Sequence, residues 1–140
     1  MRERKMRHLV YSAFLVFLSG FLTGCIESPL QTEKIRELSF VVLTEEEIPK
    51  ELKEQIEKEK ENTFRMSYED AGMLYIAEGY GKQAKTGYCV EVIQIYETEN
   101  AIGFHTHLIG PEKVVETEKT ETYPYVVIMT EDIGKMVIFE

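Results

Sequence analysis

Two histidines, His105 and His107, are separated by a single residue. Of all the side-chain pairs in the sequence, this one has the spacing that most directly suggests chemistry. Alternate residues of a β-strand point to the same face, so both imidazoles could reach one metal ion. A catalytic zinc site also needs a third protein ligand and an open position, and no third ligand is marked by the sequence. A metal-dependent enzyme using His105 and His107 is therefore the less favoured alternative. We expect no cofactor and no catalytic residue.

The sequence contexts of the two cysteines predict different roles for them. Cys25 follows Leu22-Thr23-Gly24, behind a positively charged start and an apolar run, which is the pattern of an export signal with a small-residue cleavage site. These four residues resemble the lipobox of bacterial lipoproteins, which implies that Cys25 becomes the lipidated first residue of the mature protein. The alternative is an ordinary secretory signal with a chance cysteine. Cys89 lies in an apolar run and is expected to be a small buried side chain.

The pattern around Cys25 predicts three parts. Residues 1–24 are expected to be a lipoprotein signal peptide, residues 25–35 a lipid-anchored tether, and residues 36–140 a β-rich domain. The uncharged run from Leu9 to Gly24 is shorter than the ~20 apolar residues that a membrane-spanning helix needs. We therefore expect the protein on the extracytoplasmic face of the cell membrane, attached through the lipid at Cys25.

The charge of the chain argues against nucleic acid as a partner. Four of the 16 basic residues and one of the 25 acidic residues lie in the first 24 positions, so the remainder carries 12 basic and 24 acidic residues, a net charge of −12. Binding to phosphates needs a basic stripe, which this composition does not supply. The favoured interpretation is a soluble acidic surface, and an acidic docking face for a basic partner is the alternative.

The histidine pair is expected on the second strand of a hairpin. The first strand, residues 89–96, is largely apolar on both faces, with Val92 and Ile95 predicted on opposite sides. The return strand, residues 101–109, should place Ile102 and Phe104 in the core and the histidines on the other face. The loop that leads into the hairpin is expected over residues 78–85.

The remaining elements predict the fold class. Alternation over residues 36–43 indicates a first strand, and the spacing of Ile48, Leu52 and Ile56 predicts a helix over residues 49–61 that covers a sheet. Residues 64–68, 73–77, 126–129 and 136–139 read as further strands. The whole favours an α+β fold, mainly antiparallel β, with a sandwich-like arrangement of about seven strands and one covering helix.

Two short stretches resemble a known family. They are Thr86-Gly87-Tyr88 and Thr122-Tyr123-Pro124-Tyr125-Val126-Val127. They are similar to the characteristic stretches of the C-terminal domain of the protease-complex subunit PrcB family, and the resemblance extends over roughly residues 72–139. It implies an exported lipoprotein or cell-surface protein without catalytic activity, which assembles with or stabilises a secreted or surface protease.

The same two stretches supply the candidate protein-binding residues. Tyrosines at strand ends offer rigid contact area with a hydrogen-bonding tip. The alternative is that they fix the ends of a β-sandwich. A second alternative function is a protease inhibitor-like domain that presents its threonine-glycine turn to the enzyme. The candidate contact residues are Thr86, Gly87, Tyr88, Tyr123, Pro124 and Tyr125.

Overall fold

The computed structural model describes residues 33–113 and 120–140, so Cys25, the predicted signal peptide and most of the predicted tether lie outside the described residues. The described residues contain eight strands, one α-helix and one 3-10 turn. In chain order these are β1 (Arg36–Glu37), β2 (Phe40–Val42), η1 (Glu45–Glu47), α2 (Lys50–Glu59), β3 (Thr63–Asp70), β4 (Met73–Tyr80), β5 (Cys89–Glu97), β6 (Ala101–Ile109), β7 (Tyr125–Glu131) and β8 (Met136–Phe139).

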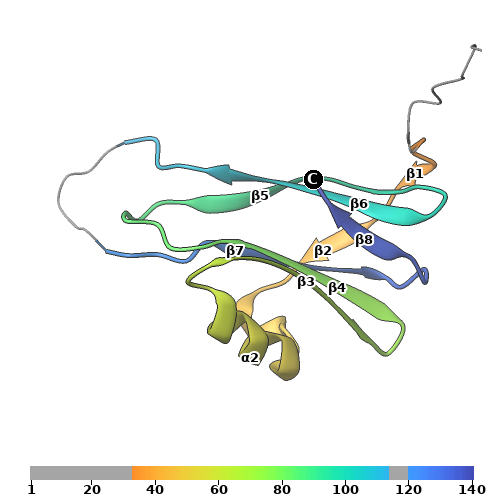
Figure 1. Cartoon of the computed structure of the whole chain (residues 1–140), viewed down its shortest axis with the longest axis horizontal. Helices are drawn as coiled ribbons and strands as arrows, with labels where there is room; N and C mark the ends of the chain where they lie inside the picture. Colours follow the sequence, from red (N-terminus) through yellow and green to blue (C-terminus); the bar gives the residue numbers. More distant parts are fainter. Residues whose placement is uncertain (1–32, 114–119) are drawn as a thin grey trace, which may run out of the picture. The chain divides into compact units, whose positions relative to one another are not determined.

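The strands form two sheets of four, in the orders β1-β5-β6-β8 and β2-β7-β4-β3 (Figure 1). The pair β6–β8 is parallel and the other pairs are antiparallel. The predicted class, α+β with mainly antiparallel strands and one helix, is confirmed, with eight strands in place of about seven.

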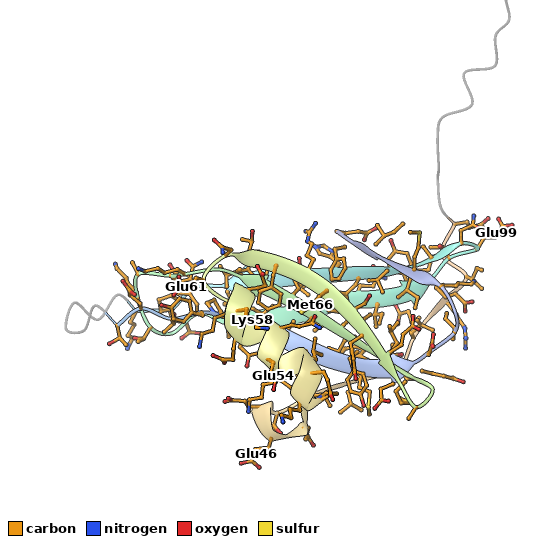
Figure 2. The ribbon with its side chains drawn as sticks, turned by 60° about the horizontal axis from the view of Figure 1, so that its bottom comes forward. Glu46, Glu54, Lys58, Glu61, Met66 and Glu99 are labelled. Carbon is orange, nitrogen blue, oxygen red and sulfur yellow. The ribbon has the colours of Figure 1, made fainter. Side chains whose placement is uncertain are left out.

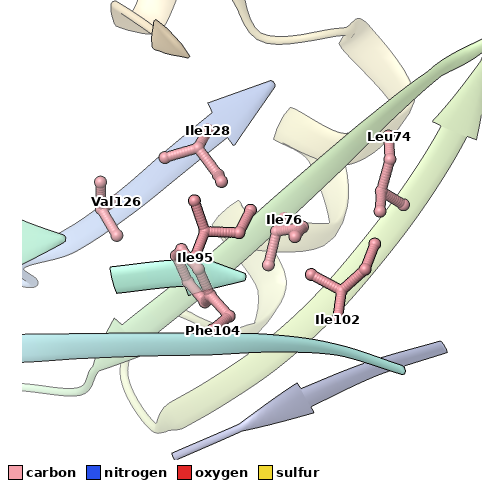
Figure 3. Close-up of a cluster of buried hydrophobic side chains, with 7 residues drawn as sticks. All are labelled: Leu74, Ile76, Ile95, Ile102, Phe104, Val126 and Ile128. Atoms are coloured by element: carbon pink, nitrogen blue, oxygen red, sulfur yellow. The ribbon is translucent and has the colours of Figure 1, made fainter. Parts of the chain in front are cut away.

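The main core lies between the two sheets. Inward-facing residues of β4 and β7 meet those of β5 and β6, as expected where alternate side chains of two stacked sheets interdigitate (Figure 3). Ile102 and Phe104 belong to this core, and the alternation along β6 places the histidines on the opposite face of the sheet, as predicted. The buried members are Leu74, Ile76, Ile95, Ile102, Phe104, Val126 and Ile128.

A second core lies under the helix, on the other face of the β2-β7-β4-β3 sheet. The predicted stripe of Ile48, Leu52 and Ile56 is buried there, which confirms the covering helix. The helix begins directly after Pro49, a residue that suits a helix start because it has no N–H to satisfy. Figure 2 brings the helix side of the domain forward, and the labelled Glu54 and Lys58 of α2 are exposed.

The prediction of one strand over residues 36–43 is wrong. β1 pairs with β5 in one sheet, and β2 pairs with β7 in the other. Leu38, between them, packs against the core between the sheets, whereas Val41 and Val42 of β2 are each 54% exposed. The chain therefore crosses from one sheet to the other at residues 38–39, because a continuous strand could not pair with both sheets.

The predicted faces of β5 are also wrong. The register shifts between Val92 and Gln94, which leaves Ile93 as an extra residue that is 50% exposed. A β-bulge of one residue reverses the alternation, so Val92 and Ile95 both pack against the core between the sheets. Cys89, predicted to be buried, is exposed at the first position of β5.

The predicted loop over residues 78–85 begins too early. β4 extends to Tyr80 and pairs with β3 along eight residues on each strand. The connecting turn contains Ala71 and Gly72, both with positive φ (50° and 79°), which is the backbone of a two-residue hairpin turn. Glu78 therefore lies within a strand, where it is buried.

Candidate functional site

Main-chain pairing brings the two motif stretches to the same end of the domain. The main-chain N–H of Gln83 donates to the carbonyl of Thr122 (2.8 Å), and the N–H of Thr122 donates to the carbonyl of Gln83 (3.0 Å). The Thr122 hydroxyl donates to the carbonyl of Lys85 (2.9 Å). The starts of β5 and β7 consequently lie at the same end of the domain (Figure 1).

An open hollow of about 360 Å3 lies between these two strand starts. Tyr88, Pro124 and Tyr125 contribute to it from the two motif stretches, and β2 with the segment before α2 supplies the remaining wall. Most of the lining residues have apolar or aromatic side chains. The lining consists of Val42, Leu43, Glu45, Ile48, Tyr88, Cys89, Val90, Pro124, Tyr125, Val126 and Val127.

Gly87 fixes the position of Tyr88 at the edge of the hollow. Its φ of 91° lies in the region that favours glycine, and a Cβ there would come within 2.9 Å of Cβ of Pro111. Tyr88 is half-buried, and its ring lies beside Gly110, 3.5 Å from where a Cβ would stand. The turn thus holds the Tyr88 ring against the end of β6.

Tyr125 contributes both to the hollow and to the core under the helix. Its ring centroid lies 6.2 Å from that of Phe64, and it packs against the buried cluster around Leu52. Burial, together with the carboxylates of Glu45 and Glu57, raises the pKa of Tyr125 above its usual value. Tyr125 therefore fits both interpretations, as a residue that packs in the fold and as a residue that lines the hollow.

The other candidate contact residues do not line the hollow. Tyr123 is half-buried with the ammonium of Lys60, at the end of α2, 5.5 Å from its ring centroid, a cation–π contact. Thr86 and Gly87 are exposed in the turn before Tyr88. The structure thus gathers Tyr88, Pro124 and Tyr125 around one hollow and places Tyr123 beside the helix.

His105 and His107 point to the outer face of the β1-β5-β6-β8 sheet. His105 is half-buried and lies opposite Gln94, and His107 is exposed opposite Glu91. Within residues 33–113 and 120–140, no group of three or more His, Cys, Asp or Glu side chains could hold a metal ion. No helix in that same part of the chain is long and apolar enough to span a membrane.

A buried polar network was missed by the sequence analysis. Glu78 is only 4% exposed, and its carboxylate accepts hydrogen bonds from Nε of Arg65 (2.9 Å) and from the hydroxyl of Thr106 (2.7 Å). The hydroxyls of Tyr80 and Thr106 are 2.6 Å apart. The network joins the two sheets beside a second open hollow of about 360 Å3. Every second residue of a strand points to the same face, so Glu78, four residues after Leu74, could have been expected on the core face.

The sequence was compared with known families, curated proteins and solved structures. The family model described as PrcB C-terminal matches residues 74–131. The matched range begins in β4 and ends with β7, so it contains Thr86-Gly87-Tyr88, Tyr123-Pro124-Tyr125 and the β5 and β7 walls of the hollow. No significant match was found among curated proteins or among solved structures. Residues 74–131 are therefore similar to the PrcB C-terminal family, the same family that the two motif stretches resemble.

Proposed function

We propose that this protein is a non-catalytic binding subunit that assembles with a secreted or surface protease and stabilises it. The observation that carries this proposal is the match of residues 74–131 to the PrcB C-terminal family. The resemblance of the two motif stretches to a protease-complex subunit implies that role, and these stretches meet at one open hollow.

The chemistry of the hollow supports contact with a protein. Most of its lining residues are apolar or aromatic, and two of them, Tyr88 and Tyr125, also carry a hydroxyl, a combination that is enriched at protein interfaces. The carboxylate among the lining residues, Glu45, is paired with Lys53 at 3.3 Å. A surface of this kind gives contact area and orientation to a partner.

Affinity purification from membranes of the producing cell tests this function. We expect the wild-type protein to retain a protease that is identified by mass spectrometry and by its activity. Tyr88→Ala should reduce that retention, because it removes an aromatic side chain from the hollow. Tyr123→Ala is the matched control, since it removes a half-buried tyrosine of the second stretch that lies outside the hollow. Absence of any protease from the wild-type sample would refute the proposal.

Deleting the protein separates a stabilising subunit from the inhibitor alternative. A stabilising subunit predicts less protease protein and lower total activity in the deletion strain. An inhibitor predicts unchanged protease protein with higher activity. The two quantities are measured in the same samples by immunoblot and by substrate cleavage.

We also propose that the protein is lipid-anchored through Cys25 on the extracytoplasmic face of the membrane. The support is the resemblance of residues 22–25 to a lipobox behind an export signal. In cells labelled with a fatty acid analogue, the wild-type protein and Cys89→Ser should both carry the label, and Cys25→Ser should not. Label on Cys25→Ser, or an unlabelled wild-type protein in the medium, would contradict the anchor.

A further inference from the structure

The β1-β5-β6-β8 sheet has an incomplete edge where the hollow opens. β1 pairs with β5 at Tyr96 and Glu97, and the N–H of Leu38 donates to the carbonyl of Ile95 (3.1 Å). Beyond that point the chain crosses to the other sheet. Over residues 89–94, no strand in the described part of the chain pairs with this edge of β5.

The pairing of β5 with β6 shows which main-chain groups face the free edge. In an antiparallel pair, alternate residues direct both their N–H and their C=O toward the same neighbour. The carbonyl of Ala101, the first residue of β6, accepts a hydrogen bond from the N–H of Thr98 (2.8 Å). The odd-numbered residues of β6 therefore direct their main-chain N–H and C=O groups toward β5. By the register of the pair, the odd-numbered residues of β5 before the bulge bond to β6. The even-numbered Val90 and Val92 therefore direct their N–H and C=O groups toward the free edge.

The opposite wall of the hollow has a second free edge, on β7. The N–H of Leu43 donates to the carbonyl of Val127 (2.9 Å), after which the chain leaves β7 for η1. On the other side, the N–H of Tyr80 donates to the carbonyl of Pro124 (3.0 Å). Tyr125 lies between these two bonds, so its N–H and C=O face away from β4. Unpaired main-chain groups of both sheets thus border the same hollow.

We propose that the free edge of β5 is the docking site for an extended segment of a partner protein, which adds a strand in line with β1. The inference rests on the proposed function, because it assigns to that binding subunit its mode of contact. Main-chain groups spaced two residues apart along an edge are complementary to another extended strand and not to a helix or a small ligand. The segment between Tyr88 and Gln94 has room for a partner strand of about five residues.

The surroundings of the edge indicate the chemistry of that segment. Side chains that alternate toward the hollow meet Val42, Leu43 and Ile48, so they should be apolar. The net charge of −12 for the chain after residue 24 favours basic side chains at the positions in between. The free edge of β3 offers a contrast, because it carries Arg65 and Glu69, charges that discourage strand addition.

A short capped peptide of about seven residues that alternates valine and lysine is the probe. With the full-length wild-type protein in detergent, we expect binding and slower hydrogen exchange at the amides of Val90 and Val92. Val90→Pro should weaken binding by about tenfold or more, because proline removes one donor and its ring blocks the edge. The same peptide with methylated main-chain nitrogens should not bind.

Ser67→Pro is the matched control. By the pairing of β4 with its two neighbours, Ser67 directs its N–H toward the free edge of β3, so this proline should leave peptide binding unchanged. Circular dichroism shows whether each proline variant is folded. Where Val90→Pro does not fold, Val90→Lys, which places a charge at the wall of the hollow, takes its place with the same expected loss.

The outcomes separate this inference from the proposed function. If the protease is retained equally by wild-type protein and Val90→Pro, and the peptide protects neither amide, strand addition is refuted while the protease role stands. If no protease is retained but the peptide protects Val90 and Val92, the docking edge stands and the protease role fails. A concentration-dependent dimer that Val90→Pro abolishes would assign the edge to a second copy of this chain and overturn the inference.

Discussion

Two glycines lie directly beneath aromatic rings of neighbouring strands, and they provide a quantitative test of the packing. Gly79 of β4 is opposite Phe64 of β3, and a Cβ on it would come within 2.1 Å of the ring. Gly103 of β6 is opposite Tyr96 of β5, where the corresponding distance is 2.3 Å. An alanine at either position requires the ring to move. The loss of stability in each variant depends on whether the ring can move into free space.

We predict that Gly79→Ala lowers the free energy of unfolding by about 2 kcal/mol and that Gly103→Ala changes it by less than about 1 kcal/mol. Phe64 is only 7% exposed and is held in the core under the helix, where overpacking costs about 1–3 kcal/mol. Tyr96 is on the outer face, so its ring can turn toward solvent at the loss of an exposed hydrogen bond to Glu140. Replacing glycine by alanine in a strand also stabilises the fold by about 0.5–1 kcal/mol, because the unfolded chain has less conformational freedom to lose. This gain offsets part of the cost at either position.

Urea denaturation of the two variants and the wild-type protein measures this difference. By the scaling for a domain of this size, a loss of about 2 kcal/mol corresponds to a fall in Tm of about 10 °C. Adding Phe64→Leu to Gly79→Ala should recover part of the loss in a double-mutant cycle, since the smaller side chain relieves the contact. Equal losses for the two alanine variants, or no coupling with Phe64→Leu, would refute the reasoning.

Two further predictions concern polar contacts. Thr106→Val removes the hydroxyl that donates to buried Glu78 and should lower the free energy of unfolding by about 1–3 kcal/mol, whereas Thr122→Val, whose bond is exposed, should cost less than about 1 kcal/mol in the same urea titrations. Hydrogen bonds lower the pKa of Glu97, and the one from Lys135 has the largest effect. The stabilisation that the Glu97 carboxylate gives to the folded state is therefore present above its unfolded pKa and is lost as pH falls through the lower folded pKa. Lys135→Met should therefore flatten the decline of stability below about pH 5, and an unchanged decline would contradict this assignment.

The parts of the fold that depend on local sequence were predictable. The spacing of Ile48, Leu52 and Ile56 identifies a helix with one apolar face whatever the rest of the chain does. The crossing from one sheet to the other at residues 38–39 was not predictable. Apolar side chains alternate on both sides of this point, and only the pairing of β1 with β5 and of β2 with β7 shows that they are two strands. The bulge at Ile93 has the same origin, since an extra residue on one strand is visible only against its partner.

The candidate site was predictable as a set of residues but not as a surface. The two motif stretches identify Tyr88 and Pro124, and the match to residues 74–131 confirms the family that they indicated. Their meeting at one hollow depends on main-chain bonds between Gln83 and Thr122, which are far apart in the sequence. Tyr123 shares its stretch with Pro124 but lies outside the hollow, where its ring contacts Lys60 at the end of the helix.

The distribution of hydrogen-bonding groups connects the fold to the proposed mode of binding. In the part of the chain that the structure describes, no buried side-chain nitrogen or oxygen lacks a partner, and the Glu78 network satisfies its own members. The groups that the register leaves free at the hollow belong to the main chain of Val90 and Tyr125, and those of Val92 lie farther along the same edge of β5. Main-chain groups recognise any extended segment, so they supply affinity without selecting a sequence. Selection must then come from the side chains that line the hollow, because they contact the alternate side chains of the added strand.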